Sequence, residues 1–193
     1  ADSQLKWKRR LADLGLRVTG PFDRVYFSSI YFRDPDGLIL EIATLGPGWT
    51  VDEPADQLGT TVIAPPQHLV KGHRDEDAIR AKTWPEPVPA ITADMSLTAG
   101  MHHITAIGSD MGATDAFYSG LLGLRRVKKT ANFDDPGSAH WYWGDATGRP
   151  GSESRSGPTR SACCSRCCRR LRCSPRCCTR SSTACASGCS PAS

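Results

Sequence analysis

Residues 26–44 read YFSSIYFRDPDGLILEIAT, and this stretch decides the fold that we expect. Two β-rich runs flank the tetrapeptide DPDG at positions 34–37. Proline and aspartate suit the two centres of a type I turn, and glycine suits the left-handed residue that follows them. The stretch therefore predicts a β-hairpin with a three-residue loop, in which Asp34 lies opposite Leu38. Counting outward from the loop places Tyr31 opposite Glu41.

Alternation of side chains along the two strands divides this hairpin into an apolar face and a mixed face. The apolar face holds Ile30, Phe32, Leu38, Leu40 and Ile42. The mixed face holds Ser29, Tyr31, Glu41 and Ala43. We expect the apolar face to pack on helices. A carboxylate is costly to bury without a partner, so Glu41 either belongs to a polar pocket or faces solvent on a one-sided sheet.

The rest of the first half reads as a helix and further strands. Apolar residues recur near helical spacing over residues 3–14, and Gly15 ends that helix. Strands are expected at residues 16–18, 24–32 and 38–44. Residues 46–64 resemble an irregular loop. Residues 65–99 are polar and proline-bearing, with one short helix near 75–82, so we interpret them as a linker.

The second half has the complementary pattern. It predicts a strand at 101–107, an amphipathic helix at 112–122 with Phe117, Leu121 and Leu122 on one side, and strands at 124–131 and 138–143. Each half is then a βαβββ unit that lacks one strand, the first half at its start and the second at its end. We therefore predict an α+β fold of two incomplete βαβββ modules that form cupped mixed β-sheets.

The last segment, residues 152–193, differs sharply in composition from the rest. It contains all nine cysteines and eight arginines, with one acidic residue and no aromatic residue. A metal knuckle at Cys164 and Cys167, a disulfide framework and a frameshifted gene are three interpretations, of which we favour the third. So little apolar surface cannot offset the entropy lost on ordering, so we expect this tail to be disordered.

Charge and hydropathy exclude several classes of protein. The chain carries a net charge of +4 and the tail alone +7, so residues 1–151 carry 4 − 7 = −3 and show no nucleic-acid footprint. No run of eighteen apolar residues indicates a membrane span. The first residues, ADSQLKWKRR, lack the apolar core of a signal peptide. A cytoplasmic protein that contacts neither nucleic acid nor membrane is the expectation.

Histidines supply further candidates for a site. In a strand His102 and His103 point to opposite faces, so only one of them can point into a given pocket. The other histidine could donate a hydrogen bond that supports the site from outside. Taken alone, the pair would more often be ordinary strand-edge histidines. We expect His140 to be structural, and His68 and His73 to be solvated.

Several motifs together resemble the vicinal oxygen chelate superfamily, which includes glyoxalases, bleomycin-resistance proteins and extradiol dioxygenases, and within it the ring-cleaving dioxygenases of the hydroquinone-dioxygenase type. The motifs are MHHITA at 101–106, FYSGLLGL at 117–124, VKKT at 127–130, NFDDPG at 132–137, the hairpin at 30–44, GPG at 46–48 and VDEP at 51–54. On this resemblance, residues 1–64 correspond to the C-terminal part of one module and residues 100–151 to the N-terminal part of a second. The order of the halves is reversed relative to the family, so the chain resembles a fused or truncated product.

The resemblance also implies a site. His103 corresponds to the first metal ligand and Glu41 to the last, while His102, Arg24 and Tyr31 correspond to residues that surround such a site. The family's remaining ligand is a histidine on the strand before the first helix, and the chain begins after that position. A mononuclear iron site of the two-histidine, one-carboxylate type needs all three ligands.

By resemblance, the function is Fe(II)-dependent cleavage of a dihydroxylated aromatic ring by O₂, with Mn, Zn or Ni as alternative metals. A small aromatic substrate and O₂ are the expected partners, and a homodimer is compatible with the family. A glyoxalase-like isomerase or lyase, in which a divalent metal polarises a carbonyl, is the alternative. An inactive fragment and a metal-free binding module of the same fold also stay open.

Overall fold

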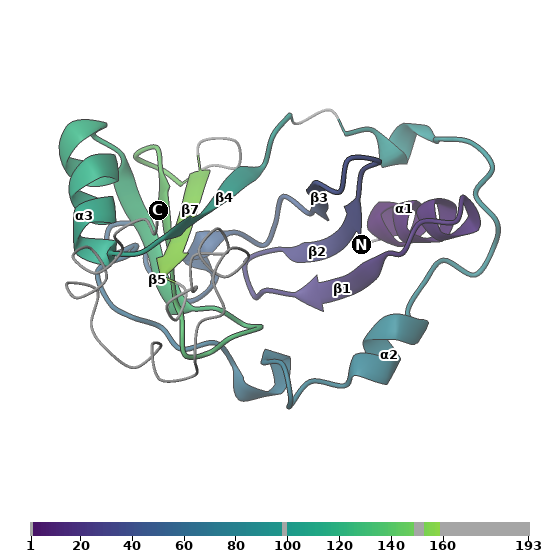
Figure 1. The fold of residues 1–193 in the computed structure, drawn as a ribbon, viewed down its shortest axis with the longest axis horizontal. Coiled ribbons are helices and arrows are strands. Elements are labelled where there is room, and N and C mark those ends of the chain that lie inside the picture. Colours follow the sequence, from purple (N-terminus) through teal and green to yellow (C-terminus); the bar gives the residue numbers. More distant parts are fainter. Residues whose placement is uncertain (1, 98–99, 149–152, 159–193) are drawn as a thin grey trace, which may run out of the picture. The chain divides into compact units, whose positions relative to one another are not determined.

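The first half of the chain forms a helix and a three-stranded sheet in the predicted order (Figure 1). The computed structural model describes residues 2–97, 100–148 and 153–158, which all belong to one unit, residues 1–159. The elements of the first half are α1 (Asp2–Asp13), β1 (Thr19–Asp23), β2 (Ser28–Arg33) and β3 (Ile39–Ala43). The strands lie in the order β1-β2-β3, and both neighbouring pairs are antiparallel.

The hairpin of β2 and β3 has the predicted register. Tyr31 pairs with Glu41, and the backbone N–H of Asp34 donates to the carbonyl of Leu38 at 3.0 Å. Gly37 has a φ of 88°, in the left-handed region that the loop requires. The turn sequence and the two-residue period of the strands together fix this register.

The buried face of α1 is largely polar, which the apolar spacing did not predict. Its buried residues are Gln4, Lys8 and Leu11, whereas Leu14 is 63% exposed. The side-chain amide of Gln4 donates to the carbonyls of Ser28 and Ile42, each at 2.8 Å. The helix therefore holds the sheet through hydrogen bonds to backbone carbonyls as well as through apolar contact.

The segment interpreted as a linker packs along α1. It contains α2 (Glu76–Ala81) and short 3-10 turns at Gln67–Leu69 and Ala93–Met95. The Lys8 ammonium donates to the carbonyls of Ile79, Arg80 and Lys82 at 2.7–3.1 Å, at the end of α2 where a cation is favourable. Burial lowers the pKa of Lys8 below its usual value. Met95, which is 1% exposed, accepts a hydrogen bond from the Trp7 indole through its carbonyl.

The second half forms a four-stranded sheet with one parallel pair. Its elements are β4 (His103–Gly108), α3 (Met111–Asp115), a π-helical turn (Ala116–Leu121), β5 (Arg125–Ala131), β6 (Ala139–Gly144) and β7 (Glu153–Pro158). The strand order is β4-β7-β6-β5, with β4 and β7 parallel and the other pairs antiparallel. Of the two sheets in the part of the chain that the structure describes, only this one is mixed.

Strand β7 corrects two predictions. The second half was expected to lack its last strand, and the whole of residues 152–193 was expected to be disordered, yet residues 153–158 fill the place between β4 and β6. The prediction weighed side chains alone. Without β7, the facing edges of β4 and β6 would leave N–H and C=O groups unpaired, and an extended backbone satisfies such groups whatever its side chains. The rest of the tail, with its cysteines, lies outside the described residues.

The apolar core joins the two halves. It is formed by six buried residues: Tyr26, Phe27, Trp49, Leu58, Val127 and Tyr142. The ring of Trp49 lies 4.8 Å from that of Tyr26 and 4.5 Å from that of Tyr142, measured between centroids. Residues from the turn before β2, from the loop after β3 and from β5 and β6 therefore share one core.

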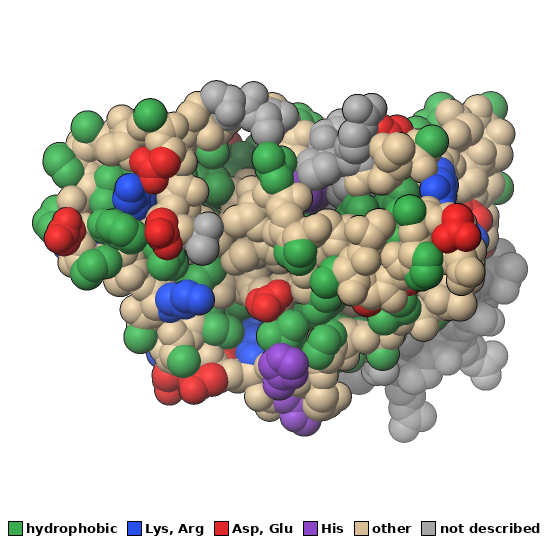
Figure 2. All heavy atoms as spheres, turned by 180° about the vertical axis from the view of Figure 1, so that it is seen from behind, with side chains coloured by type: hydrophobic (Ala, Val, Ile, Leu, Met, Phe, Trp, Pro, Cys, Tyr) green, Lys and Arg blue, Asp and Glu red, His purple; other side chains and the backbone are tan. Residues whose placement is uncertain are grey.

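Part of the predicted apolar surface is not covered. On the hairpin Ile30 is fully buried, but Leu38 is 63% exposed and Leu40 37%. The predicted helix at residues 112–122 was expected to have an apolar side, and Phe117 and Leu121 on that side are likewise exposed. Apolar side chains and charged side chains of both signs are interspersed on the face shown in Figure 2. None of the described helices is long and apolar enough to cross a membrane.

Candidate functional site

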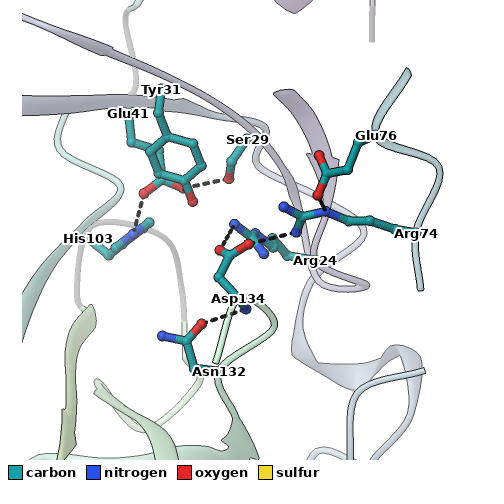
Figure 3. A network of polar contacts seen from close by, with 9 residues as sticks. All are labelled: Arg24, Ser29, Tyr31, Glu41, Arg74, Glu76, His103, Asn132 and Asp134. Carbon is teal, nitrogen blue, oxygen red and sulfur yellow. Dashed lines mark hydrogen bonds and ion pairs between the residues drawn. The ribbon is translucent and has the colours of Figure 1, made fainter. Parts of the chain in front are cut away.

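Glu41 lies at the centre of a polar cluster on the mixed face of the hairpin (Figure 3). Its Oε1 accepts hydrogen bonds from the Ser29 hydroxyl at 2.5 Å and from the Tyr31 hydroxyl at 3.1 Å. Its Oε2 lies 3.0 Å from Nε2 of His103, which comes from the second half of the chain. The Glu41 and His103 side chains are 16% and 3% exposed. The pocket alternative for Glu41 is therefore the correct one, since the carboxylate is largely buried and has partners.

The two neighbouring histidines do not diverge as predicted. The Nδ1 atoms of His102 and His103 lie 2.8 Å apart, and both rings contact Phe27, with centroid distances of 5.0 and 5.5 Å. Alternation fails because β4 begins at His103, so His102 does not follow the strand geometry. The contact leaves His102 able to support His103 through a hydrogen bond.

All five predicted site residues line one cleft of about 1360 Å³: Arg24, Tyr31, Glu41, His102 and His103. The wall also contains His140, which is buried and stacks on Tyr142 with 4.8 Å between ring centroids. His68 and His73 are exposed, as predicted. A polar end and apolar walls are typical of a site for a small organic molecule.

Arg24 enters the cleft from the turn between β1 and β2. Its Nη2 donates to Oδ2 of Asp134 at 2.8 Å, and Asp134 also accepts from Arg74 at 2.7 Å. Burial lowers the pKa of Arg24, but Tyr31 and Asp134 outweigh it and hold that pKa above its usual value. Burial likewise raises the pKa of Asp134, while the two guanidinium groups outweigh it and hold that pKa below the usual range.

A second charged cluster lies beside the core, and the sequence did not single it out. The fully buried Nζ of Lys128 contacts Oδ1 of Asp52 at 2.5 Å and Oε2 of Glu53, and it lies 4.7 Å from the ring centre of Tyr26. The Tyr26 hydroxyl donates to Asp52 at 2.9 Å. Burial and the nearby carboxylates raise the pKa of Tyr26 well above its usual value. Lys128 belongs to the VKKT motif, and Asp52 and Glu53 belong to the VDEP motif, so these two motifs contact each other.

The donor atoms around Glu41 and His103 limit what the cleft can hold. Among the described residues, no group of three or more histidine, cysteine, aspartate or glutamate side chains is placed to hold a metal ion. Glu41 and His103 supply two adjacent donors of the right chemical kind, one imidazole and one carboxylate. No signal in the sequence identified Arg74 or the role of Asp134, because both lie in segments without periodicity.

Comparisons with known proteins cover part of the chain. No protein-family model matches it. Two proteins of Bacillus subtilis (strain 168), "Putative ring-cleaving dioxygenase MhqO" and "Putative ring-cleaving dioxygenase MhqE", are 54% and 53% identical to it over 55 residues. These matches cover 28% of this chain and only 18% of each relative.

A crystal structure of a "putative dioxygenase" from the same species has 51% sequence identity, covers 31% of this chain and 19% of that one, and gives a TM-score of 0.30. The chain thus spans about a fifth of the length of the relatives it matches. Over that shared part, its sequence supports a relationship to dioxygenase-type proteins.

Proposed function

We propose that the cleft is part of the site of a ring-cleaving dioxygenase of the vicinal oxygen chelate type, in which His103 and Glu41 are ligands to a divalent metal. The observation that carries the proposal is the 3.0 Å contact between Nε2 of His103 and Oε2 of Glu41, which joins two segments far apart in the sequence. The names of the partial relatives support the reaction class.

The residues present fit such a metal only in part. A two-histidine, one-carboxylate site needs three ligands, and the described residues provide one imidazole and one carboxylate. We propose Fe(II) as the metal, with Mn, Zn or Ni as alternatives; when bound, it would mediate electron transfer from a dihydroxylated aromatic to O₂.

Metal binding through Nε2 of His103 competes with the contact between this nitrogen and Glu41. Nε2 faces a carboxylate oxygen at 3.0 Å, so that nitrogen is placed to donate a hydrogen bond to Glu41 through its proton. A metal ligand needs a free lone pair, so binding through Nε2 requires that this proton leave. His102 offers a partner on the other side of the ring, because its Nδ1 lies 2.8 Å from Nδ1 of His103 and can accept a proton donated from there.

We propose that Tyr31, Arg24 and His102 bind and orient the oxygen atoms of the substrate. The Tyr31 hydroxyl donates to Glu41, and the Arg24 guanidinium lies 5.8 Å from the Tyr31 ring. His102 adds an imidazole beside His103. Such groups stabilise negative charge on a phenolic oxygen and exchange protons with it. A dihydroxylated aromatic fits this combination because its two oxygens need donors while its ring needs apolar walls.

Metal binding by this chain tests the ligands directly. We expect weak one-to-one binding of Fe(II), measured by anaerobic calorimetry, and little ring cleavage, measured as oxygen uptake with hydroquinone or catechol. Glu41→Ala and His103→Ala should weaken metal binding roughly tenfold or more. Glu86→Ala and His68→Ala are matched controls, because both residues are exposed and lie outside the cleft.

A gain-of-function variant tests the same site from the other direction. Adding a β-strand with a histidine before Ala1 supplies a third ligand and should raise both Fe(II) affinity and oxygen uptake. Glu41→Ala in that extended protein should abolish the uptake. Oxygen uptake that survives this change would show that Glu41 is not the carboxylate ligand.

A further inference from the structure

The carboxylate of Asp134 lies between two buried arginines that come from different parts of the chain (Figure 3). Oδ2 accepts from Nη2 of Arg24 at 2.8 Å, and Oδ1 accepts from Nη1 of Arg74 at 2.7 Å. Arg24 belongs to the β1–β2 turn, Arg74 to the segment before α2, and Asp134 to the turn between β5 and β6. One carboxylate thus joins three separate segments next to the cleft.

Arg24 is enclosed at this place. Its side chain is 7% exposed, and the centre of its guanidinium lies 5.1 Å from the ring of Phe22, 5.8 Å from that of Tyr31 and 5.6 Å from that of Phe133. Its Nε is buried and has no hydrogen-bond partner among the residues that the structure describes. Such an arginine depends strongly on its ion pair, because an unpaired buried charge is costly.

Asp134 is itself held independently of Arg24. Its backbone N–H donates to the side-chain oxygen of Asn132 at 2.8 Å, which fixes the turn. Arg74 is fixed in turn by Glu76, whose Oε1 lies 2.7 Å from the Arg74 Nε, and by the ring of Phe22 at 4.2 Å. The carboxylate therefore offers Arg24 an acceptor whose position is already determined, and a guanidinium binds best to an acceptor that is preorganised.

The backbone that carries Arg24 is also constrained. Val25, the next residue, has a φ of 69°, which is unfavourable for a β-branched side chain. Its N–H donates to the carboxylate of Asp23 at 2.7 Å, and its side chain packs against the core. Strain of this kind persists only where the surrounding structure determines the conformation. The backbone of the turn therefore fixes the direction in which the Arg24 side chain leaves it.

We infer that Asp134 is a positioning residue, which with Arg74 as its anchor holds the guanidinium of Arg24 beside Tyr31 at the polar end of the cleft. The importance of this placement for substrate rests on the proposed function, whereas the placement itself does not. This role of Asp134 and Arg74 means that the NFDDPG turn and the segment before α2 help to assemble the site.

The experiment follows the Arg24 side chain in the full chain labelled with ¹⁵N-arginine. The Nε–Hε resonance of Arg24 is assigned by its loss in Arg24→Lys, and its exchange with water is measured by NMR. Asp134→Asn removes the charge while keeping the shape, and should speed that exchange roughly tenfold or more because Arg24 leaves its enclosed position. Arg74→Lys, which cannot span two carboxylates as a guanidinium does, should give a smaller acceleration.

Asp135→Asn is the matched control. It removes the same charge from the same turn, but the Asp135 carboxylate accepts from the Ser138 hydroxyl, and among the described residues no ion pair joins it to Arg24 or Arg74. Exchange at Arg24 should be unchanged in this variant, and far-UV circular dichroism should show that all variants are folded. Equal exchange in wild type and Asp134→Asn, with both folded, would overturn the inference.

A second arm separates this inference from the proposed function. Binding of hydroquinone is followed by tryptophan fluorescence, and Asp134→Asn should weaken it about fivefold or more if Arg24 contacts a substrate oxygen. Faster exchange at Arg24 together with hydroquinone binding that is absent even in wild type would support the positioning of Arg24 and contradict the proposed substrate. Equal hydroquinone affinity in Asp134→Asn and wild type would overturn the role of Asp134 in substrate binding.

Discussion

Replacing Lys128 by methionine tests whether the buried ion cluster holds the two halves together. Lys128 is fully buried and is the cation that Asp52 and Glu53 share, and the Glu53 side chain is itself only 5% exposed. Methionine fills a similar volume, so packing changes little. The main loss is electrostatic, because two carboxylates are left without their cation and one of them stays in the interior.

The structure sets the magnitude of this loss. Removing one partner from a buried ion pair destabilises proteins by about 3–5 kcal/mol. The upper part of this range applies to Glu53, whereas Asp52 is 25% exposed and keeps its hydrogen bond from the Tyr26 hydroxyl. We therefore expect Lys128→Met to lower the free energy of unfolding by about 3–5 kcal/mol, which corresponds to a fall in Tm of roughly 6–20 °C for a chain of this size.

Urea unfolding followed by circular dichroism measures this free energy. Lys129→Met is the matched control. The side chain of this neighbouring lysine has a cation–π contact with Trp141 at 5.5 Å, so the change should cost less than about 1 kcal/mol. Adding Asp52→Asn and Glu53→Gln to Lys128→Met removes the stranded charges and should recover most of the loss. A loss below about 1 kcal/mol in the single variant, or no recovery in the triple variant, would refute the reasoning.

Two further predictions concern alkaline stability and the last strand. The raised pKa of Tyr26 means that the folded state favours the protonated phenol, so this stability is fully present below the unfolded pKa of about 10 and is lost as the pH rises further. The free energy of unfolding, measured by urea titration at a series of pH values, should therefore fall less steeply between about pH 10 and 11 in Tyr26→Phe than in wild type. Identical slopes of this free energy against pH would contradict the prediction. Truncation after residue 152 removes β7 and should lower Tm relative to truncation after residue 159, because it leaves the facing edges of β4 and β6 unpaired; equal Tm values would mean that β7 contributes nothing.

Local rules predicted the first half of the fold well. The turn at residues 34–37 and the alternation of the strands gave the pairing of Tyr31 with Glu41, and Gly15 marked the end of α1. These features depend on residues that are close in the sequence, where turn geometry and side-chain period decide the outcome. The same rules failed for the buried face of α1, because hydrogen bonds from Gln4 and Lys8 to distant carbonyls outweighed its apolar spacing.

The sequence by itself determined which side chains share a face of the hairpin and therefore that Glu41 accompanies Ser29 and Tyr31. Only the tertiary structure decided that His103 meets that carboxylate and that Asp134 bridges Arg24 and Arg74. The physical reason is that these contacts join segments many residues apart, and such contacts form only when the two halves bury a common core. Tyr26 and Trp49 from one half and Tyr142 from the other complete that core, and no local period or turn signal specifies their meeting.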